Sequence, residues 1–243
     1  MTRLPSVGAF LVVASAFAGC SVGGSGYPGD TQLVVHGEVT SADPPGPKEI
    51  VFVWQLGAPP SMDQVDPDFR GGMPQTRTSD PWFTIRIYDY PPPDLPLQRL
   101  EDGEVAFARG NLVAIPLGWL PDRIEPAIAA GEVGFGASVG HWIVYLDGPA
   151  EAGTLTAWWL GAPSGLGSGY HLVRVEPFAC MTEAERTACI EEVLAIASVS
   201  DAATAERYCD APYRLSPVSP WGTSVPVEIG MFSVPPPPDC PAP

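Results

Sequence analysis

Lysine is almost missing from this 243-residue chain, because Lys48 is the only lysine among its 12 basic residues. The chain also contains 28 acidic residues, so its formal net charge is −16. A nucleic-acid partner needs a compensating cationic surface, so this composition argues against one. Charged residues are scarce overall at 16%, whereas 45% of the sequence is hydrophobic. A chain this apolar can bury a core, which argues against wholesale disorder.

Long apolar runs are missing as well. The run Val7–Phe17 has only eleven residues, whereas a membrane-spanning helix needs about 20. Behind a short positive start it suits the core of a signal peptide. The run leads into Phe17-Ala18-Gly19-Cys20, which resembles the lipobox of bacterial lipoproteins, with Phe17 at the position of the usual leucine. We therefore expect residues 1–19 to be removed and Cys20 to be lipidated; the alternative is an ordinary cleaved signal with an incidental cysteine.

The lipoprotein resemblance implies a location in the cell envelope. Ser21 follows the lipidated cysteine, and in Gram-negative lipoproteins a residue other than aspartate there favours the outer membrane. Several acyl chains on Cys20 would hold the protein stably on the membrane. Residues 20–31 are rich in glycine and serine, which is typical of a flexible tether. We expect an outer-membrane lipoprotein whose domain faces the periplasm or the cell surface.

Proline and glycine are plentiful, at 30 and 26 residues, and a proline every few positions excludes a mainly helical fold. Short segments between them alternate in polarity or are continuously apolar, as β-strands do. The sequence therefore predicts one mainly β domain over residues 32–232, an antiparallel β-sandwich, followed by a Pro-rich tail at 233–243. The predicted strands are Leu33–Val39, Ile50–Leu56, Trp82–Tyr90, Leu112–Leu117, Trp142–Asp147, Thr154–Leu160, Tyr170–Glu176 and Val225–Phe232.

One segment predicts helices instead, at about residues 182–208. Thr182 and Glu185 have the spacing of a capping box, in which each side chain binds the other residue's backbone amide. Asp201 is placed to cap a second short helix that ends near Tyr208. We expect a short C-terminal helical hairpin inserted into the sandwich.

Four cysteines remain besides Cys20, and an even number in an exported chain indicates two disulfides with three possible pairings. Cys189 and Cys209 lie almost symmetrically about the turn between the two helices, so we favour a Cys189–Cys209 bridge. Cys180 would then pair with Cys240. A zinc site is the weaker interpretation, because the cysteines lack close ligand spacing and have no histidine nearby.

Gly136-Ala137-Ser138-Val139-Gly140 matches the G-x-S-x-G pattern of serine hydrolases, and Asp147 and His171 follow in hydrolase order. That chemistry needs the serine on a strand-to-helix turn within reach of the histidine. Because the residues after Ser138 predict a strand, we favour a Gly-rich turn and keep the hydrolase with Ser138, Asp147 and His171 as an alternative.

Metal sites are the next candidates. Asp63, Asp66 and Asp68 crowd one loop, and calcium prefers several carboxylate oxygens in a loop. The EF-hand spacing is absent, so a solvated acidic loop is the preferred interpretation and calcium binding the alternative. The three histidines, His36, His141 and His171, lack the paired spacing of zinc sites, and no cofactor is expected.

Trp158 and Trp159 are the clearest binding hint. In a strand, adjacent side chains point to opposite faces, so one ring would be core and the other could contact a sugar or a partner protein. Two stretches, Gly37–Val39 with Ile50–Trp54 and Thr78–Ile85, resemble the small sandwich domains related to transthyretin and to the regulatory domains of carboxypeptidases. The resemblance covers residues 31–93 and implies a non-catalytic adhesion or scaffold module. We expect a lipid-anchored binding or scaffold protein with an unknown protein or carbohydrate partner.

Overall fold

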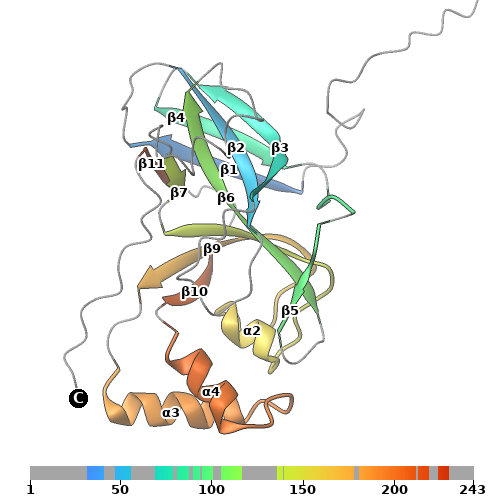
Figure 1. Cartoon of the computed structure of the whole chain (residues 1–243), viewed down its shortest axis with the longest axis vertical. Coiled ribbons are helices and arrows are strands. Elements are labelled where there is room, and N and C mark those ends of the chain that lie inside the picture. The colour runs from blue at the N-terminus through green and yellow to red at the C-terminus, as the bar shows by residue number, and fades with distance from the viewer. Residues whose placement is uncertain are drawn as a thin grey trace, which may run out of the picture.

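A computed structural model of the chain describes residues 32–40, 47–55, 69–78, 81–87, 90–93, 95–100, 105–116, 136–138, 140–177, 181–211, 213–218 and 224–229. These ranges hold eleven strands and three helices, so the expected mainly β, sandwich-like fold is confirmed (Figure 1). The strands are β1 Leu33–Val39, β2 Lys48–Gln55, β3 Phe69–Thr78, β4 Trp82–Ile87, β5 Gln98–Arg99, β6 Ala106–Pro116, β7 Gly136–Ser138, β8 His141–Leu146, β9 Gly169–Pro177, β10 Tyr213–Val218 and β11 Ser224–Ile229. The helices are α2 Leu155–Trp159, α3 Glu183–Leu194 and α4 Ala202–Cys209.

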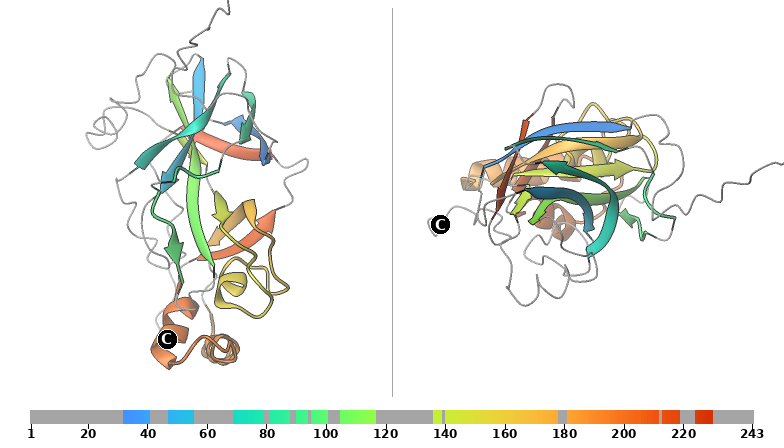
Figure 2. Two further views of the ribbon diagram at one scale, coloured as in Figure 1. Left: turned by 90° about the vertical axis from the view of Figure 1, so that its right-hand side faces the viewer. Right: turned by 90° about the horizontal axis from the view of Figure 1, so that it is seen from above.

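The long strand β6 organises the sheet. One of its edges pairs with β2 and then β5, and the other edge pairs with β7 and then β8. β6 therefore runs through both the upper and the lower part of the sheet (Figure 2). β8 continues the lower part of the sheet through β9 to β10, whereas β7 leads through β11 and β1 to β4 in the upper part. The pairs between described strands are antiparallel except for one, because β1 and β11, the first and last of these strands, run parallel.

The upper core fills the space between the β1–β4–β11 layer and the β2–β6–β8–β9 layer. Alternation along each strand supplies it, as in β4, where Phe83, Ile85 and Ile87 are buried and the residues between them are exposed. Trp54 on β2 packs against Phe52 and Tyr170, which gives this core an aromatic centre. The two layers form the sandwich that the sequence predicts.

The lower core lies on the opposite side of β8 and β9, between these strands and the three helices (Figure 1). Trp142 and Val144 of β8 point into it, whereas Ile143 and Tyr145 point into the upper core. β8 is thus buried on both faces, and its almost continuous apolar sequence follows from that position.

The helical pair forms as the sequence predicts. Thr182 and Glu185 make the complete capping box, and the Asp201 side chain accepts from the Thr204 amide at 2.8 Å. Arg186 of α3 donates two hydrogen bonds to the Asp210 carboxylate just beyond α4, at 2.8 and 2.9 Å. Within the described ranges, no helix is long and apolar enough to cross a membrane.

Acid should weaken this helical pair. Hydrogen bonds lower the pKa of three carboxylates: Thr204 acts on Asp201, Arg186 on Asp210 and Thr182 on Glu185. Because the folded pKa lies below the unfolded one, their stabilisation is complete above the unfolded values near 4 and is lost as the pH falls through the folded values. Thermal melting between pH 6 and 2.5 should show this loss, and Asp201→Asn, which keeps a capping acceptor that does not titrate, should show less of it. An identical acid response in Asp201→Asn would contradict the assignment to Asp201.

The predicted strand at Thr154–Leu160 is wrong, because this segment forms helix α2. The Thr154 side chain accepts from the Ala157 amide at 3.2 Å and caps the helix. Leu155 and Trp159, four residues apart, both point into the lower core. A six- or seven-residue apolar run suits a strand or a buried helix turn equally well, and here the lower core determines which one forms.

Two long strands escape sequence prediction, β3 and β10. β3 contains Gly71, Gly72 and Pro74, which are typical of a loop. Among the described strands it pairs only with β2, through a register shift between Val51 and Val53. β10 contains Pro217, and β9 is its only partner among the described strands. Edge strands tolerate proline because one row of their amides needs no partner.

Candidate functional site

Ser138 lies at the corner where the chain leaves β7 and enters β8. Its hydroxyl donates to the His141 carbonyl at 2.9 Å and accepts from the Leu112 amide at 3.4 Å. Leu112 lies on β6 between the residues that pair with β8 and those that pair with β7, so the serine oxygen fills a gap in the ladder. Gly140, with φ of +68°, turns the chain into β8. The G-x-S-x-G pattern here builds a corner between two parts of the sheet.

The other two residues of the alternative triad, His171 and Asp147, take no part in this corner. His171 on β9 donates from Nε2 to the Gly167 carbonyl at 2.8 Å. Asp147 is exposed just beyond the end of β8. Ser138 and His171 therefore use their hydrogen bonds on backbone groups, and the described contacts contain no Ser–His–Asp relay.

Replacing Ser138 with alanine should therefore cost stability. The Leu112 amide would lose a buried acceptor, which costs about 1–3 kcal/mol in urea unfolding. His171→Ala, which removes one partly exposed contact, should cost less than about 1 kcal/mol. The wild-type protein should not react with a serine-directed fluorophosphonate probe. Labelling that disappears in Ser138→Ala would instead support the hydrolase alternative.

The expected metal residues are mostly outside the described part of the chain, since Asp63, Asp66 and Asp68 all lie beyond it. His36 is exposed on β1 and its Nδ1 is hydrogen-bonded to the Thr84 hydroxyl at 2.9 Å. Among the described residues, no three His, Cys, Asp or Glu side chains gather in a way that could hold a metal ion.

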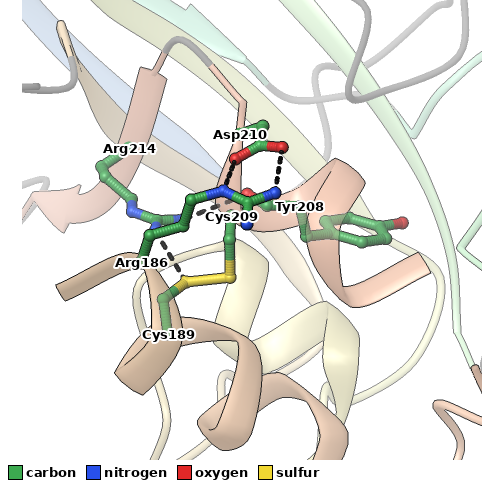
Figure 3. Close-up of a disulfide and its surroundings, with 6 residues drawn as sticks. All are labelled: Arg186, Cys189, Tyr208, Cys209, Asp210 and Arg214. Atoms are coloured by element: carbon green, nitrogen blue, oxygen red, sulfur yellow. Dashed lines mark hydrogen bonds and ion pairs between the residues drawn. A yellow bond between two sulfur atoms is a disulfide. The ribbon is translucent and has the colours of Figure 1, made fainter. Parts of the chain in front are cut away.

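The cysteines give one disulfide in the described ranges. Cys189 of α3 and Cys209 of α4 are bonded, with their Cα atoms 6.0 Å apart (Figure 3). Arg214 of β10 lies beside this bridge and donates from Nη2 to the Cys189 sulfur at 3.2 Å. Cys20, Cys180 and Cys240 lie outside the described residues, so the lipidation site and the second pairing stay predictions.

Trp158 and Trp159 sit on helix α2, so the expectation that they point to opposite faces of a strand is wrong. Trp159 is buried in the lower core, with its ring 5.2 Å from that of Phe107. Trp158 is half-buried, and the Arg214 guanidinium lies over its ring at 4.8 Å. Trp159 therefore belongs to the core, whereas binding through the half-buried Trp158 stays a prediction.

Similarity to known proteins gives no further guide to the site. No protein-family model matches this chain, and no curated protein or solved structure is significantly similar to it. The candidate surfaces therefore follow from the burial and exposure of the described residues.

The strongest exposed candidate is the outer face of β1 and β4, which we call the Trp82 face. Its members form three directly opposite cross-strand pairs: Glu38 with Trp82, His36 with Thr84, and Val34 with Arg86. Trp82 is 58% exposed, which is unusual for so large an apolar side chain. The inner face of the same strands is buried in the upper core, so the side chains of the Trp82 face stand on a rigid base.

A second candidate is buried, on the outer face of β6. Arg109 and Asn111 are only 4% and 6% exposed. The Arg109 guanidinium lies 4.9 Å from the centre of the Trp142 ring. Burial lowers the pKa of Arg109 to about 10, so the side chain still carries its charge at neutral pH.

Neither candidate emerges from the sequence. Trp82 belongs to a segment that alternates in polarity like any half-buried strand. Only the packing of the two layers shows that its side chain lies on the outer face. Arg109 and Asn111 flank Gly110 in a segment whose hydrophobic pattern is broken by these two polar residues. Both residues precede the predicted strand Leu112–Leu117, so no local pattern marked them as buried.

Proposed function

We propose that this protein is a lipid-anchored protein of the cell envelope that binds carbohydrate through the Trp82 face, without catalysing a reaction. The observation that carries the binding proposal is the exposed Trp82 side chain on a rigid, two-stranded base. The lipobox-like sequence that ends at Cys20 supports the anchor. The resemblance of residues 31–93 to transthyretin-like domains supports a non-catalytic role.

The chemistry of the Trp82 face suits a sugar. An indole ring offers a flat apolar surface with one polar edge, against which the C–H face of a sugar ring can stack. Around it stand a cation, an acid, an imidazole and a hydroxyl, from Arg86, Glu38, His36 and Thr84. Together these groups donate and accept hydrogen bonds, as the hydroxyl groups of a sugar require.

The size of the Trp82 face favours a short oligosaccharide over a protein partner. Residues 82–86 of one strand span about 14 Å, and two strands are about 10 Å wide, so the face covers roughly 140 Å². A stable protein interface buries about 800 Å² on each partner. A sugar needs far less area, because a few hydrogen bonds and one stacked ring can position it.

Binding should be tested with purified peptidoglycan in a sedimentation assay and with lipopolysaccharide by affinity electrophoresis. We expect wild-type protein to bind at least one of these glycans and Trp82→Ala to bind it at least tenfold more weakly. Tyr90→Ala is the matched control, because Tyr90 is a comparably exposed aromatic residue (67%) outside the Trp82 face. Equal binding by Trp82→Ala and wild type, or no binding to either glycan, would contradict the proposal.

The anchor has its own test. Cells that express the protein should incorporate labelled palmitate into it, and Cys20→Ala should remove the label. Cys189→Ala with Cys209→Ala is the control, because it removes two cysteines elsewhere and should leave labelling unchanged. Label that persists in Cys20→Ala would contradict the lipobox interpretation.

A further inference from the structure

The buried candidate on β6 lies on the opposite side of the sandwich from the Trp82 face. Ala108 and Leu112 of β6 point into the upper core. Side chains alternate along a strand, so Arg109 and Asn111 point the other way, to the outer face of this layer. Trp142 points to that same side from β8. Outer faces of sandwiches usually carry polar residues in water, but here both polar side chains are buried.

Among the described residues, three polar atoms of this pair have no hydrogen-bond partner: Nε and Nη1 of Arg109 and Oδ1 of Asn111. Native structures rarely leave buried polar atoms without partners, and each such atom calls for a specific explanation. The charge on Arg109 makes the missing partners more costly, because burying a cation is unfavourable unless an anion or several acceptors surround it. The Trp142 ring contributes a weak attraction to the cation and no hydrogen-bond acceptor.

We propose that Arg109 and Asn111 bind a small hydroxycarboxylate, that is, an organic oxyanion that also carries hydroxyl groups. The carboxylate would accept hydrogen bonds from the guanidinium and neutralise its charge. A hydroxyl group of the ligand would hydrogen-bond to the Asn111 side-chain amide in either of the two flipped orientations of that amide, because a hydroxyl both donates and accepts. The two residues are two positions apart on one strand, about 6.7 Å between Cα atoms, a span that one such ligand can bridge.

The test compares melting temperatures of the protein over residues 20–243, the expected mature chain, in sodium gluconate, acetate, phosphate and chloride at equal ionic strength. Long incubation precedes each melt, because both side chains are buried and ligand exchange will be slow. We expect gluconate to raise the melting temperature in a saturable way, by about 3–5 °C at ten times its dissociation constant. Acetate, which lacks the hydroxyl groups, should give a smaller shift.

Variants assign the effect to the site. Arg109→Met should abolish the gluconate shift, whereas Arg174→Met, at an exposed arginine on β9, should keep it. Asn111→Ala should reduce the gluconate shift to that of acetate. Should Arg109→Met fail to fold, Arg109→Lys replaces it, and gluconate should bind several-fold more weakly because lysine lacks the planar set of donors.

Several results would overturn the proposal. The proposed site would be contradicted if gluconate did not raise the melting temperature of the wild type, or if it raised that of Arg109→Met equally. Unchanged gluconate affinity in Arg109→Lys would contradict it too. An Arg109-dependent shift from phosphate as large as that from gluconate would overturn the hydroxycarboxylate assignment. None of these outcomes depends on glycan binding by the Trp82 face, so the two proposals can fail separately.

Discussion

Gly161→Ala should be among the most damaging single substitutions in the described part of the chain. Gly161 follows α2 with φ of +67°, a left-handed conformation that only glycine adopts at low cost. The Gly161 amide donates to Trp158 and the Ala162 amide to Ala157, which together make a Schellman motif. A β-carbon at Gly161 would also collide with the Leu215 carbonyl oxygen of β10. The helix end and the edge strand could not both keep their places.

We expect Gly161→Ala to lower the free energy of unfolding by about 4 kcal/mol, as the sum of backbone strain and overpacking. Gly153→Ala is the matched control. Gly153 also has positive φ, at +78°, but a β-carbon there meets nothing within 4 Å. It should cost only about 1 kcal/mol from backbone strain. Urea unfolding measures both values, and equal losses would show that the close approach to β10 is unimportant.

Removal of the Cys189–Cys209 disulfide should be the second large effect. The bridge closes a sequence separation of 20 residues between α3 and α4. In the chain-entropy account, a loop of this size contributes about 3 kcal/mol. For a domain of this length, the Cys189→Ala/Cys209→Ala double variant should melt about 6–12 °C lower than wild type. A change of less than about 1 °C would show that the packing of α3 on α4 suffices without the bridge.

The same double variant tests the pairing of the other two cysteines. A reducing agent should lower the melting temperature of wild type by breaking the Cys189–Cys209 bridge and the predicted Cys180–Cys240 bridge. In the double variant, any further loss on reduction must come from another disulfide, for which Cys180–Cys240 is the prediction. No further loss would contradict that second pairing or show that it contributes nothing to stability.

Local signals in the sequence were sufficient to predict several elements of the fold. The capping box at Thr182 and the alternation in β4 depend on neighbours a few residues away, and both form as predicted. The Cys189–Cys209 bridge followed from the symmetry of its cysteines about one turn. Such features are decided within one element or one hairpin.

Features that depend on distant partners could not be predicted in this way. α2 is a helix because Leu155 and Trp159 fit the lower core, which strands far along the chain complete. β10 needs β9 beside it before a segment with Pro217 becomes a strand. Arg109 looked like an ordinary charged residue until the layers showed that it is buried. Tertiary context overrode local propensity at each of these places.

β8 and β9 are shared by the two cores, and this has a consequence for how the molecule unfolds. Each strand contributes one face to the upper core and the other face to the lower core. Loss of the helices would expose Trp142 and Val144 to water and loosen the layer on which the sandwich closes. Neither half can melt without weakening the other, so the domain should behave as one cooperative unit, with its slowest-exchanging amides in the shared pair of strands.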